Sequence, residues 1–325
     1  MAKTAIEFVK VSKKFPNASK YAVSEVSAKI EEGSFVTILG TSGSGKTTFM
    51  KMVNRIYEPT SGEILFFGES SKKLPVEDLR RKIGYVIQQI GLFPHMTVEE
   101  NIATVPKILK WDRKKIAERV DDLLELVHLP PQEYKKRYPR QLSGGQQQRV
   151  GLARAMAADP SIMLMDEPFG AIDAITRQTL QDELIRIQKK LNKTILFVTH
   201  DIHEAFKLGD KVMIMHEGEI QQFDTPRQIL FKPANEYVAR LISSEDILQR
   251  LRILKAEAVM NPLDSELKAG DIRVGRSEFL HHVLTRFLEK DLEYVVVEDE
   301  QHQAVGKITW EQFKSVTQPG APVSS

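Results

Sequence analysis

The chain has 325 residues, of which 46 are basic and 44 are acidic, so its formal charge at neutral pH is only +2. This balance gives no global field that would attract nucleic acid, and the absence of cysteine excludes disulfides and thiolate metal sites. The longest apolar runs fall short of the roughly 18 residues that span a bilayer, so we expect a soluble chain that reaches a membrane only through other subunits.

Residues 6 to about 222 alternate short apolar runs with amphipathic helices, as in an α/β fold. The run 34–39 predicts a buried strand, and residues 47–56 predict a helix. Between them the pattern GxxxxGK[ST] is matched in full by Gly40, Thr41, Ser42, Gly43, Ser44, Gly45, Lys46 and Thr47. In such a loop backbone N–H groups surround phosphate oxygens, while the lysine reaches the β- and γ-phosphates and the threonine hydroxyl can hold Mg²⁺. We therefore predict a nucleotide site here.

One aromatic side chain ahead of this loop is a candidate for stacking on a nucleotide base. Phe15 is the first choice and Tyr21 the competing one, because aromatic faces bind bases without hydrogen bonds. Packing in the core is the alternative for both rings.

The stretch from about residue 88 to 159 has few β-branched runs and reads as a helical insertion. It contains the segment 142–150, with the sequence LSGGQQQRV. A glycine pair preceded by serine exposes backbone N–H groups at a helix start, which is a second phosphate-binding arrangement in a chain that already has one. The two arrangements need a common explanation.

Three later runs, 161–166, 194–199 and 211–216, predict buried strands, with a crossover helix between the first two. Polar side chains follow these runs and the earlier run 83–87. Because ligands of open parallel sheets bind at the carboxyl ends of the strands, we expect the side chains to share one site. They are Gln88, Asp166, Glu167 and His200.

Their expected tasks differ. Asp166 would hold Mg²⁺ through its water shell, and Glu167 would polarise the water that attacks the γ-phosphate. His200 would bond that phosphate, and Gln88 would touch Mg²⁺ or the water. Taken singly, each is equally a polar residue at the end of a strand.

At this point the chain resembles the ATP-binding subunit of an ABC transporter over residues 4 to about 235. The motifs stand in that family's order: the Walker A loop at 40–47, the Q-loop at Gln88, the signature at 142–150, Walker B at 162–167, the D-loop at 170–173 and the H-loop at His200. The resemblance implies a P-loop ATPase with a helical subdomain, and ATP and Mg²⁺ as ligands.

It further implies that two identical subunits close head to tail. Each ATP would then lie between the Walker A loop of one chain, extended through Thr48, and the signature of the other. Asp173 would couple the two sites. The signature residues that would bind the γ-phosphate are Ser143, Gly145 and Gln146, and Gly144 belongs to the same ATP-binding set.

The segments 88–102 and 166–177 are similar to the osmoprotectant branch of bacterial importers, which take up glycine betaine, carnitine, choline or proline betaine. This resemblance implies a translocase at the cytoplasmic face of the membrane, working with permease subunits and an extracytoplasmic binding protein, and not with nucleic acid. Importers of amino acids or methionine share much of the framework and remain the alternative. A soluble ABC ATPase acting on DNA or ribosomes, or a regulator without turnover, is a more distant one.

The expected domains are an ATPase domain at 1–235, a helical linker at 236–276, a small α+β unit at 277–316 and a flexible tail at 317–325. The small unit has helix-strand-strand-helix order and resembles a single CBS motif, for which we expect pairing with a second copy. Gln312 stands where nucleotide-binding CBS motifs commonly have an acid, which weakens nucleotide sensing and leaves ionic strength or simple bracing open.

Overall fold

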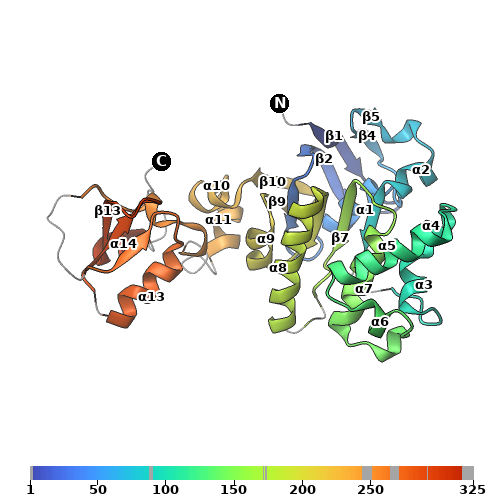
Figure 1. The fold of residues 1–325 in the computed structure, drawn as a ribbon. Coiled ribbons are helices and arrows are strands. Elements are labelled where there is room, and N and C mark those ends of the chain that lie inside the picture. The colour runs from blue at the N-terminus through green and yellow to red at the C-terminus, as the bar shows by residue number, and fades with distance from the viewer. Residues whose placement is uncertain are drawn as a thin grey trace. The chain divides into compact units, whose positions relative to one another are not determined.

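The computed structural model describes residues 3–87, 91–170, 172, 174–243, 251–263, 271–290 and 292–316. Their contacts form two compact units, Met1–Phe223 and Asp224–Ser325 (Figure 1). This boundary precedes the predicted one at residue 235. The reason is that α10 (Pro226–Phe231) follows β10 (Glu219–Asp224) almost directly, and its Phe231 packs against the apolar cluster of the second unit.

A six-stranded sheet forms the centre of the first unit, in the order β10-β9-β3-β8-β7-β6. The strands other than β10 pair in parallel. Every residue of β3, β7 and β8 is buried, as expected for strands that are covered on both faces. The five parallel strands are β3 (Phe35–Leu39), β6 (Ile83–Val86), β7 (Ile162–Asp166), β8 (Thr194–Thr199) and β9 (Lys211–His216).

The register places the carboxyl ends of the central strands level with one another. Leu39 lies opposite Thr199, and Asp166 lies opposite Val198. The predicted crossover helix is α8 (Ala174–Leu191), which joins β7 to β8. The loops that follow β3, β7 and β8 therefore open at the same edge of the sheet.

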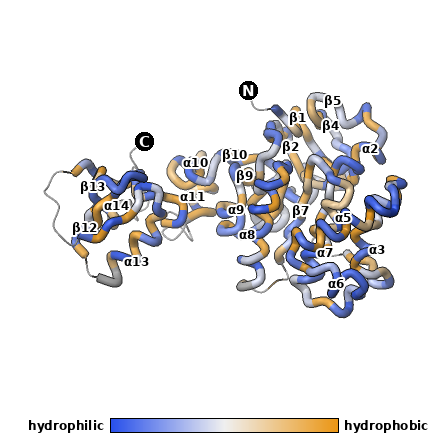
Figure 2. The backbone as a smooth tube through the Cα atoms, in the orientation of Figure 1, coloured by the Kyte–Doolittle hydropathy of each residue, from blue (hydrophilic) through white to orange (hydrophobic). Residues whose placement is uncertain are grey.

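A second, four-stranded sheet in the order β2-β1-β4-β5 and the helix α1 (Lys46–Val53) share one apolar cluster with one face of the central sheet. In that cluster the rings of Phe8 and Phe49 lie 4.4 Å apart. Figure 2 shows the hydrophobic stretches concentrated in the interior of each unit. The sheet consists of β1 (Thr4–Lys13), β2 (Val23–Glu31), β4 (Ser61–Phe66) and β5 (Glu69–Ser70), and α2 (Val76–Arg81) precedes β6.

The described residues between β6 and β7 form helices and no strand, which confirms the predicted helical insertion. The apolar stripe of α5 packs into a cluster that also contains the opposite face of the central sheet. The helices are α3 (Val98–Ile102), α4 (Thr104–Ile108), α5 (Arg113–Leu126), α6 (Pro131–Tyr134) and α7 (Gly144–Met156).

The second unit has its own core and a three-stranded sheet in the order β11-β12-β13. β12 (Tyr294–Glu298) and β13 (Ala304–Thr309) are the two predicted strands, flanked by α13 (Leu280–Lys290) and α14 (Trp310–Val316). β11 (Arg273–Gly275), parallel to β12, was not predicted, because it has three residues and only Val274 is buried.

Part of the predicted linker belongs to this core. The segment begins with α11 (Glu236–Ser243), but Leu251, Leu254 and Ala256 are buried in the apolar cluster of the second unit. The stretch 251–259 is therefore part of the folded unit, and the predicted tail lies outside the described residues. Within the described ranges, every helix is too short or too polar to cross a membrane.

Candidate active site

The loop after β3 has a backbone that only glycine permits at its key turn. Gly45, the residue before α1, has φ of +99°, and a Cβ there would stand 2.3 Å from the carbonyl oxygen of Ala22. The close approach brings the turn between β1 and β2 against the loop. Glycine at this position thus serves both the left-handed turn and the packing.

Lys46 is the buried cation of this loop. Its Nζ donates to the carbonyl oxygens of Gly40, at 2.7 Å, and Thr41, at 2.9 Å. Burial lowers the pKa of the Lys46 ammonium, and the charges of Glu167 and Asp166 oppose that shift. A desolvated ammonium beside backbone carbonyls gains strongly from anionic oxygens, which is what a phosphate would supply.

Thr47 and Asp166 lie side by side as oxygen donors. The Thr47 hydroxyl donates to Oδ1 of Asp166 at 3.2 Å, which joins the first turn of α1 to the end of β7. Burial raises the pKa of the Asp166 carboxyl, and the Thr47 hydrogen bond opposes that shift. A hydroxyl and a buried carboxylate fit Mg²⁺, which takes a few protein oxygens and completes its shell with water and phosphate.

Glu167 and His200 face each other one residue beyond their strands. Nδ1 of His200 lies 3.2 Å from Oε2 of Glu167. The backbone N–H of Glu167 donates to the carbonyl of Val198 at 3.0 Å, and its φ of +44° turns the chain sharply after β7. The carboxylate and the imidazole thus lie at the edge that carries the phosphate loop, with His200 the more exposed of the two.

Phe15 and Tyr21 flank the turn between β1 and β2. Phe15 is half-buried, its ring meets that of Tyr57 edge to face at 5.2 Å, and Nζ of Lys13 lies 5.4 Å from its centroid. Tyr21 is exposed and has Lys14 over its ring at 5.3 Å. Both rings remain candidates for the base.

The signature segment begins α7 with a reciprocal cap. Oγ of Ser143 accepts from the N–H of Gln146 at 3.3 Å, and Oε1 of Gln146 accepts from the N–H of Ser143 at 3.0 Å. Ser143 and Gly144 are exposed, and a Cβ on Gly144 would have open space around it. A Cβ on Gly145 would stand 2.8 Å from a methyl of Thr176. The segment therefore presents a capped but exposed helix start at the surface.

The structure brings most of the predicted groups together and leaves others apart. The phosphate loop, Asp166, Glu167 and His200 share one edge, whereas the signature residues bond within their own segment and to Tyr134 on α6. Gln88 and Asp173 lie outside the described residues.

A buried polar network beneath His200 escaped the sequence analysis. The Thr199 hydroxyl donates to Oε2 of Glu204, and Nε2 of Gln181 donates to its Oε1 at 3.1 Å. Burial raises the pKa of Glu204, and both hydrogen bonds oppose that shift. The spacing of Asp201 and Glu204 signals a helix start, that of α9 (Ile202–Leu208), but nothing in it indicates the contact with α8.

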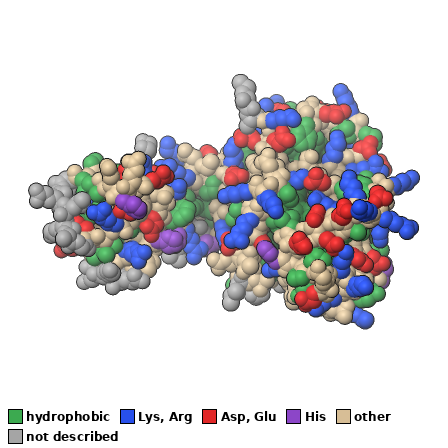
Figure 3. Space-filling view, viewed as in Figure 1, with side chains coloured by type: hydrophobic (Ala, Val, Ile, Leu, Met, Phe, Trp, Pro, Cys, Tyr) green, Lys and Arg blue, Asp and Glu red, His purple; other side chains and the backbone are tan. Residues whose placement is uncertain are grey.

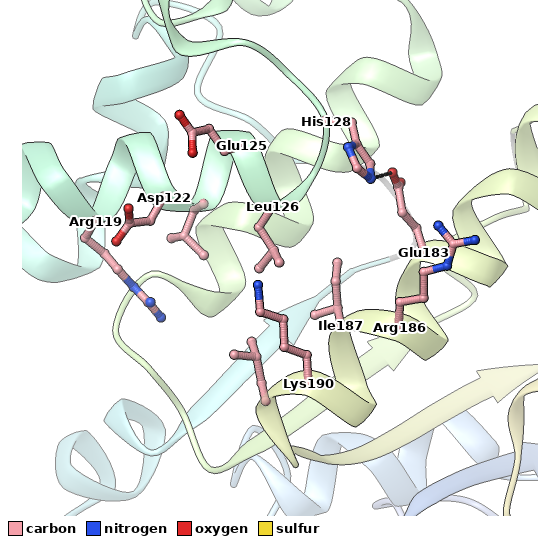
Figure 4. A pocket seen from close by; sticks show the side chains of 11 residues that line it. Arg119, Asp122, Glu125, Leu126, His128, Glu183, Arg186, Ile187 and Lys190 are labelled. Atoms are coloured by element: carbon pink, nitrogen blue, oxygen red, sulfur yellow. Dashed lines mark ion pairs between the residues drawn. The ribbon is translucent and has the colours of Figure 1, made fainter.

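A cavity of about 580 Å³ lies away from these groups, between α5 and α8 (Figure 4). At one end of it Nε2 of His128 lies 3.1 Å from Oε1 of Glu183, and Arg149 of α7 approaches the same carboxylate. No residue of the phosphate loop or of the strand ends lines this cavity. It is therefore not the nucleotide site.

Comparison with known proteins agrees with this geometry. A family model described as ABC transporter matches residues 23–170. The chain is 47% identical over 304 residues to the glycine betaine/carnitine/choline transport ATP-binding protein OpuCA of Bacillus subtilis, covering 93% of this chain and 78% of that protein. It is 45% identical over 303 residues to the glycine betaine uptake system ATP-binding protein YehX of Escherichia coli, covering 93% and 97%.

Among solved structures, the dimeric form of MJ0796, a bacterial ABC transporter cassette, is similar with a TM-score of 0.61. It is 35% identical and covers 68% of this chain and 99% of that one. Relatives this similar along nearly the whole sequence establish that the chain belongs to the ABC transporter family, as one of its ATP-binding proteins.

Proposed function

We propose that this protein hydrolyses ATP to energise the import of compatible solutes that carry a quaternary amine, such as glycine betaine, carnitine and choline. The observation that carries the proposal is a cluster of chemical groups at one edge of the central sheet. The cluster consists of Lys46, Thr47, Asp166, Glu167 and His200. The relatives named above are ATP-binding proteins of such uptake systems.

The chemistry is an in-line attack of water on the γ-phosphate. Lys46 neutralises charge on the β- and γ-phosphates. Thr47 and Asp166, with Gln88, would hold Mg²⁺, which would supply further stabilisation of the same negative charge. Glu167 accepts a hydrogen bond from the attacking water and orients it. His200, whose ring already lies beside Glu167, donates to the γ-phosphate and keeps the carboxylate in position.

The proposed Mg²⁺ site can be tested by a substitution at Thr47, one of the two residues of the pair Thr47 and Asp166. Thr47→Val keeps the shape of the side chain but removes the hydroxyl that lies 3.2 Å from Asp166. We expect the Mg²⁺ concentration for half-maximal hydrolysis to rise by about tenfold or more. An unchanged Mg²⁺ requirement would remove Thr47 from the metal site.

The site is completed by a second subunit in our proposal. The exposed start of α7 directs backbone N–H groups of its first turn outward, and an anion is favoured there by the helix dipole. A head-to-tail pair would bring Ser143, Gly144, Gly145 and Gln146 of one copy onto the ATP in the other, with Asp173 between the two sites. Phe15, or else Tyr21, would stack on the adenine.

The transported solute does not touch this subunit, which would bind permease subunits at the cytoplasmic face of the membrane, with an extracytoplasmic binding protein delivering the solute. Acidic and basic side chains are interspersed over the described surface visible in Figure 3, so this face presents no basic stripe of the kind that binds nucleic acid. An importer of amino acids or methionine remains the second candidate.

We further propose that the second unit is a single CBS-like motif that pairs with its copy and modulates transport. Its order α13-β12-β13-α14 supports this reading. Gln312 has a structural task there, since its Oε1 accepts from the N–H of Thr309 at 2.8 Å and its own N–H donates to the Thr309 hydroxyl at 3.2 Å. Because the Gln312 side chain is engaged in this cap, we favour structural bracing or a response to ionic strength as the role of the unit, over the binding of a ribose.

The decisive experiment is uptake of labelled glycine betaine, carnitine and choline, each competed with the others, in cells that carry the whole transport system. Uptake of at least one of them should depend on this chain and should vanish with Glu167→Gln. That variant should still bind ATP and should accumulate as a nucleotide-bound dimer. Uptake of an amino acid in place of these amines would overturn the solute class, and normal turnover by Glu167→Gln would remove Glu167 from its role.

A further inference from the structure

Arg177, on the first turns of α8, contacts the segments that follow two different strands of the active site. Its Nη2 donates to the carbonyl oxygen of Ile172 at 2.9 Å, in the segment that follows Glu167. Its Nη1 lies 3.8 Å from Oδ2 of Asp201, the residue after His200. One guanidinium group therefore joins the continuation of β7 to the continuation of β8.

The Asp201 end of this connection is held firmly. Oδ1 of Asp201 accepts from the N–H of Glu204 at 2.9 Å and caps α9, and its own N–H donates to the Thr199 hydroxyl at 3.0 Å. His200 stands between these two bonded neighbours, with Nδ1 3.2 Å from Glu167. A displacement of Asp201 would thus move the imidazole relative to the carboxylate.

The Ile172 end is anchored as well. Ile172 is buried, and its N–H donates to the carbonyl of Phe169 at 3.2 Å, while the Phe169 ring packs against Phe197 of β8. Nε of Arg177 is buried and has no hydrogen-bond partner among the residues that the structure describes. Because an unpaired buried donor costs free energy, this arrangement is not the one that stability alone would select.

We propose that Arg177 is a positioning residue that couples Ile172 to His200. The inference rests on the proposed two-subunit site. Closure of the pair would shift Ile172, and Arg177 would transmit the shift to Asp201 and so set the distance between His200 and Glu167. Arginine is required because its planar fork can bond a carbonyl and a carboxylate at the same time, whereas a lysine ammonium is a single point charge.

The test uses steady-state ATP hydrolysis by the full-length chain and compares kcat with KM. Arg177→Met should lower kcat by about tenfold and leave KM for ATP within about twofold, because the residue touches no part of the nucleotide. Asp201→Asn should do the same, since asparagine still caps α9 but carries no charge. The double variant should be no slower than the slower single variant, and Arg177→Lys should restore kcat only in part.

Lys207→Met is the matched control. Lys207 of α9 forms an ion pair with Asp182 of α8 at 2.8 Å, so it joins the same two helices without reaching either segment of the active site. Its kcat should stay within about twofold of the wild-type value. Thermal unfolding and ATP binding to the isolated chain should be similar for all these variants.

Three results would overturn the inference: additive losses in the double variant, an equal loss in Lys207→Met, or a rise in KM with kcat unchanged. If Arg177→Met fails to fold, Asp201→Asn alone decides, because it removes the ion pair and retains the helix cap. Normal hydrolysis by Glu167→Gln would refute the proposed mechanism itself, and it is measured independently of Arg177.

Discussion

Asn101, a buried residue of α3, holds the loop that follows the segment 88–90. Its Oδ1 accepts from the N–H of Phe93 at 2.8 Å. Its Nδ2 donates to the carbonyl oxygens of Phe93 and Met96, both at 3.2 Å, and of Thr97 at 2.9 Å. One side chain therefore organises the whole loop between residues 93 and 97, and the side chain is fully buried.

Asn101→Leu keeps the approximate volume and removes all four hydrogen bonds. At about 0.5–1.5 kcal/mol each, their loss amounts to about 2–6 kcal/mol of unfolding free energy. The carbonyls of Phe93 and Thr97 keep another backbone partner, and Phe93 is exposed enough for water to replace part of the loss. We therefore expect a destabilisation in the lower half of that range, about 2–4 kcal/mol.

Asn54→Leu provides the comparison. Asn54 is also buried, but its Oδ1 has no hydrogen-bond partner in the described part of the chain, so the same substitution should cost less than about 1 kcal/mol. Urea unfolding can be followed by fluorescence, because the chain has two tryptophans and a Trp310→Phe background leaves only Trp111, in the helical part of the first unit. Equal losses in the two variants, or a loss below about 1 kcal/mol for Asn101→Leu, would refute the reasoning.

Three further predictions concern other parts of the molecule. Ser143→Arg should spare ATP binding to the isolated chain but lower ATP hydrolysis by about a hundredfold or more, because the bulky cation would obstruct closure of the two subunits. Sedimentation of this variant in the Glu167→Gln background should find no ATP-bound dimer. Gly306→Val should disrupt the second unit, since a Cβ there would stand 2.7 Å from the carbonyl oxygen of Asn261. Basal ATP hydrolysis should persist, while the response of transport to salt should change. An unaltered salt response would make the unit purely structural. The hydrogen bond from Lys193 holds the pKa of Asp159 below its usual value, so this pair stabilises the fold above the unfolded pKa and the contribution is lost as the pH falls through the folded pKa. Asp159→Asn should remove that acid-side loss, an effect below about 1 kcal/mol at this exposed carboxylate, and unchanged acid unfolding curves would count against the pairing.

The edge of the sheet that carries the proposed site was predictable from the sequence because it depends on local order. A buried strand is a short apolar run, and the polar residue that follows it must emerge at the carboxyl end of that strand. Asp166, Glu167 and His200 could be assigned to one edge by this rule, and Thr47 by the phosphate-loop pattern. The contacts of Thr47 with Asp166 and of His200 with Glu167 agree with that placement. The difference between the predicted domain boundary and the observed compact units, the missed β11 and the core residues within the predicted linker have a common cause, since short or isolated apolar positions carry no period.

The set of chemical groups, their order along the chain and the strand ends that carry them follow from residue type and periodicity. Which distant groups meet depends on the tertiary fold. The pairing of β3, β7 and β8 levels the ends of these strands. The network of Gln181 with Glu204 and the bridge from Ile172 through Arg177 to Asp201 depend on how α8 packs beside α9. Such pairings are set by packing between segments remote in sequence, and no local pattern of residues encodes them.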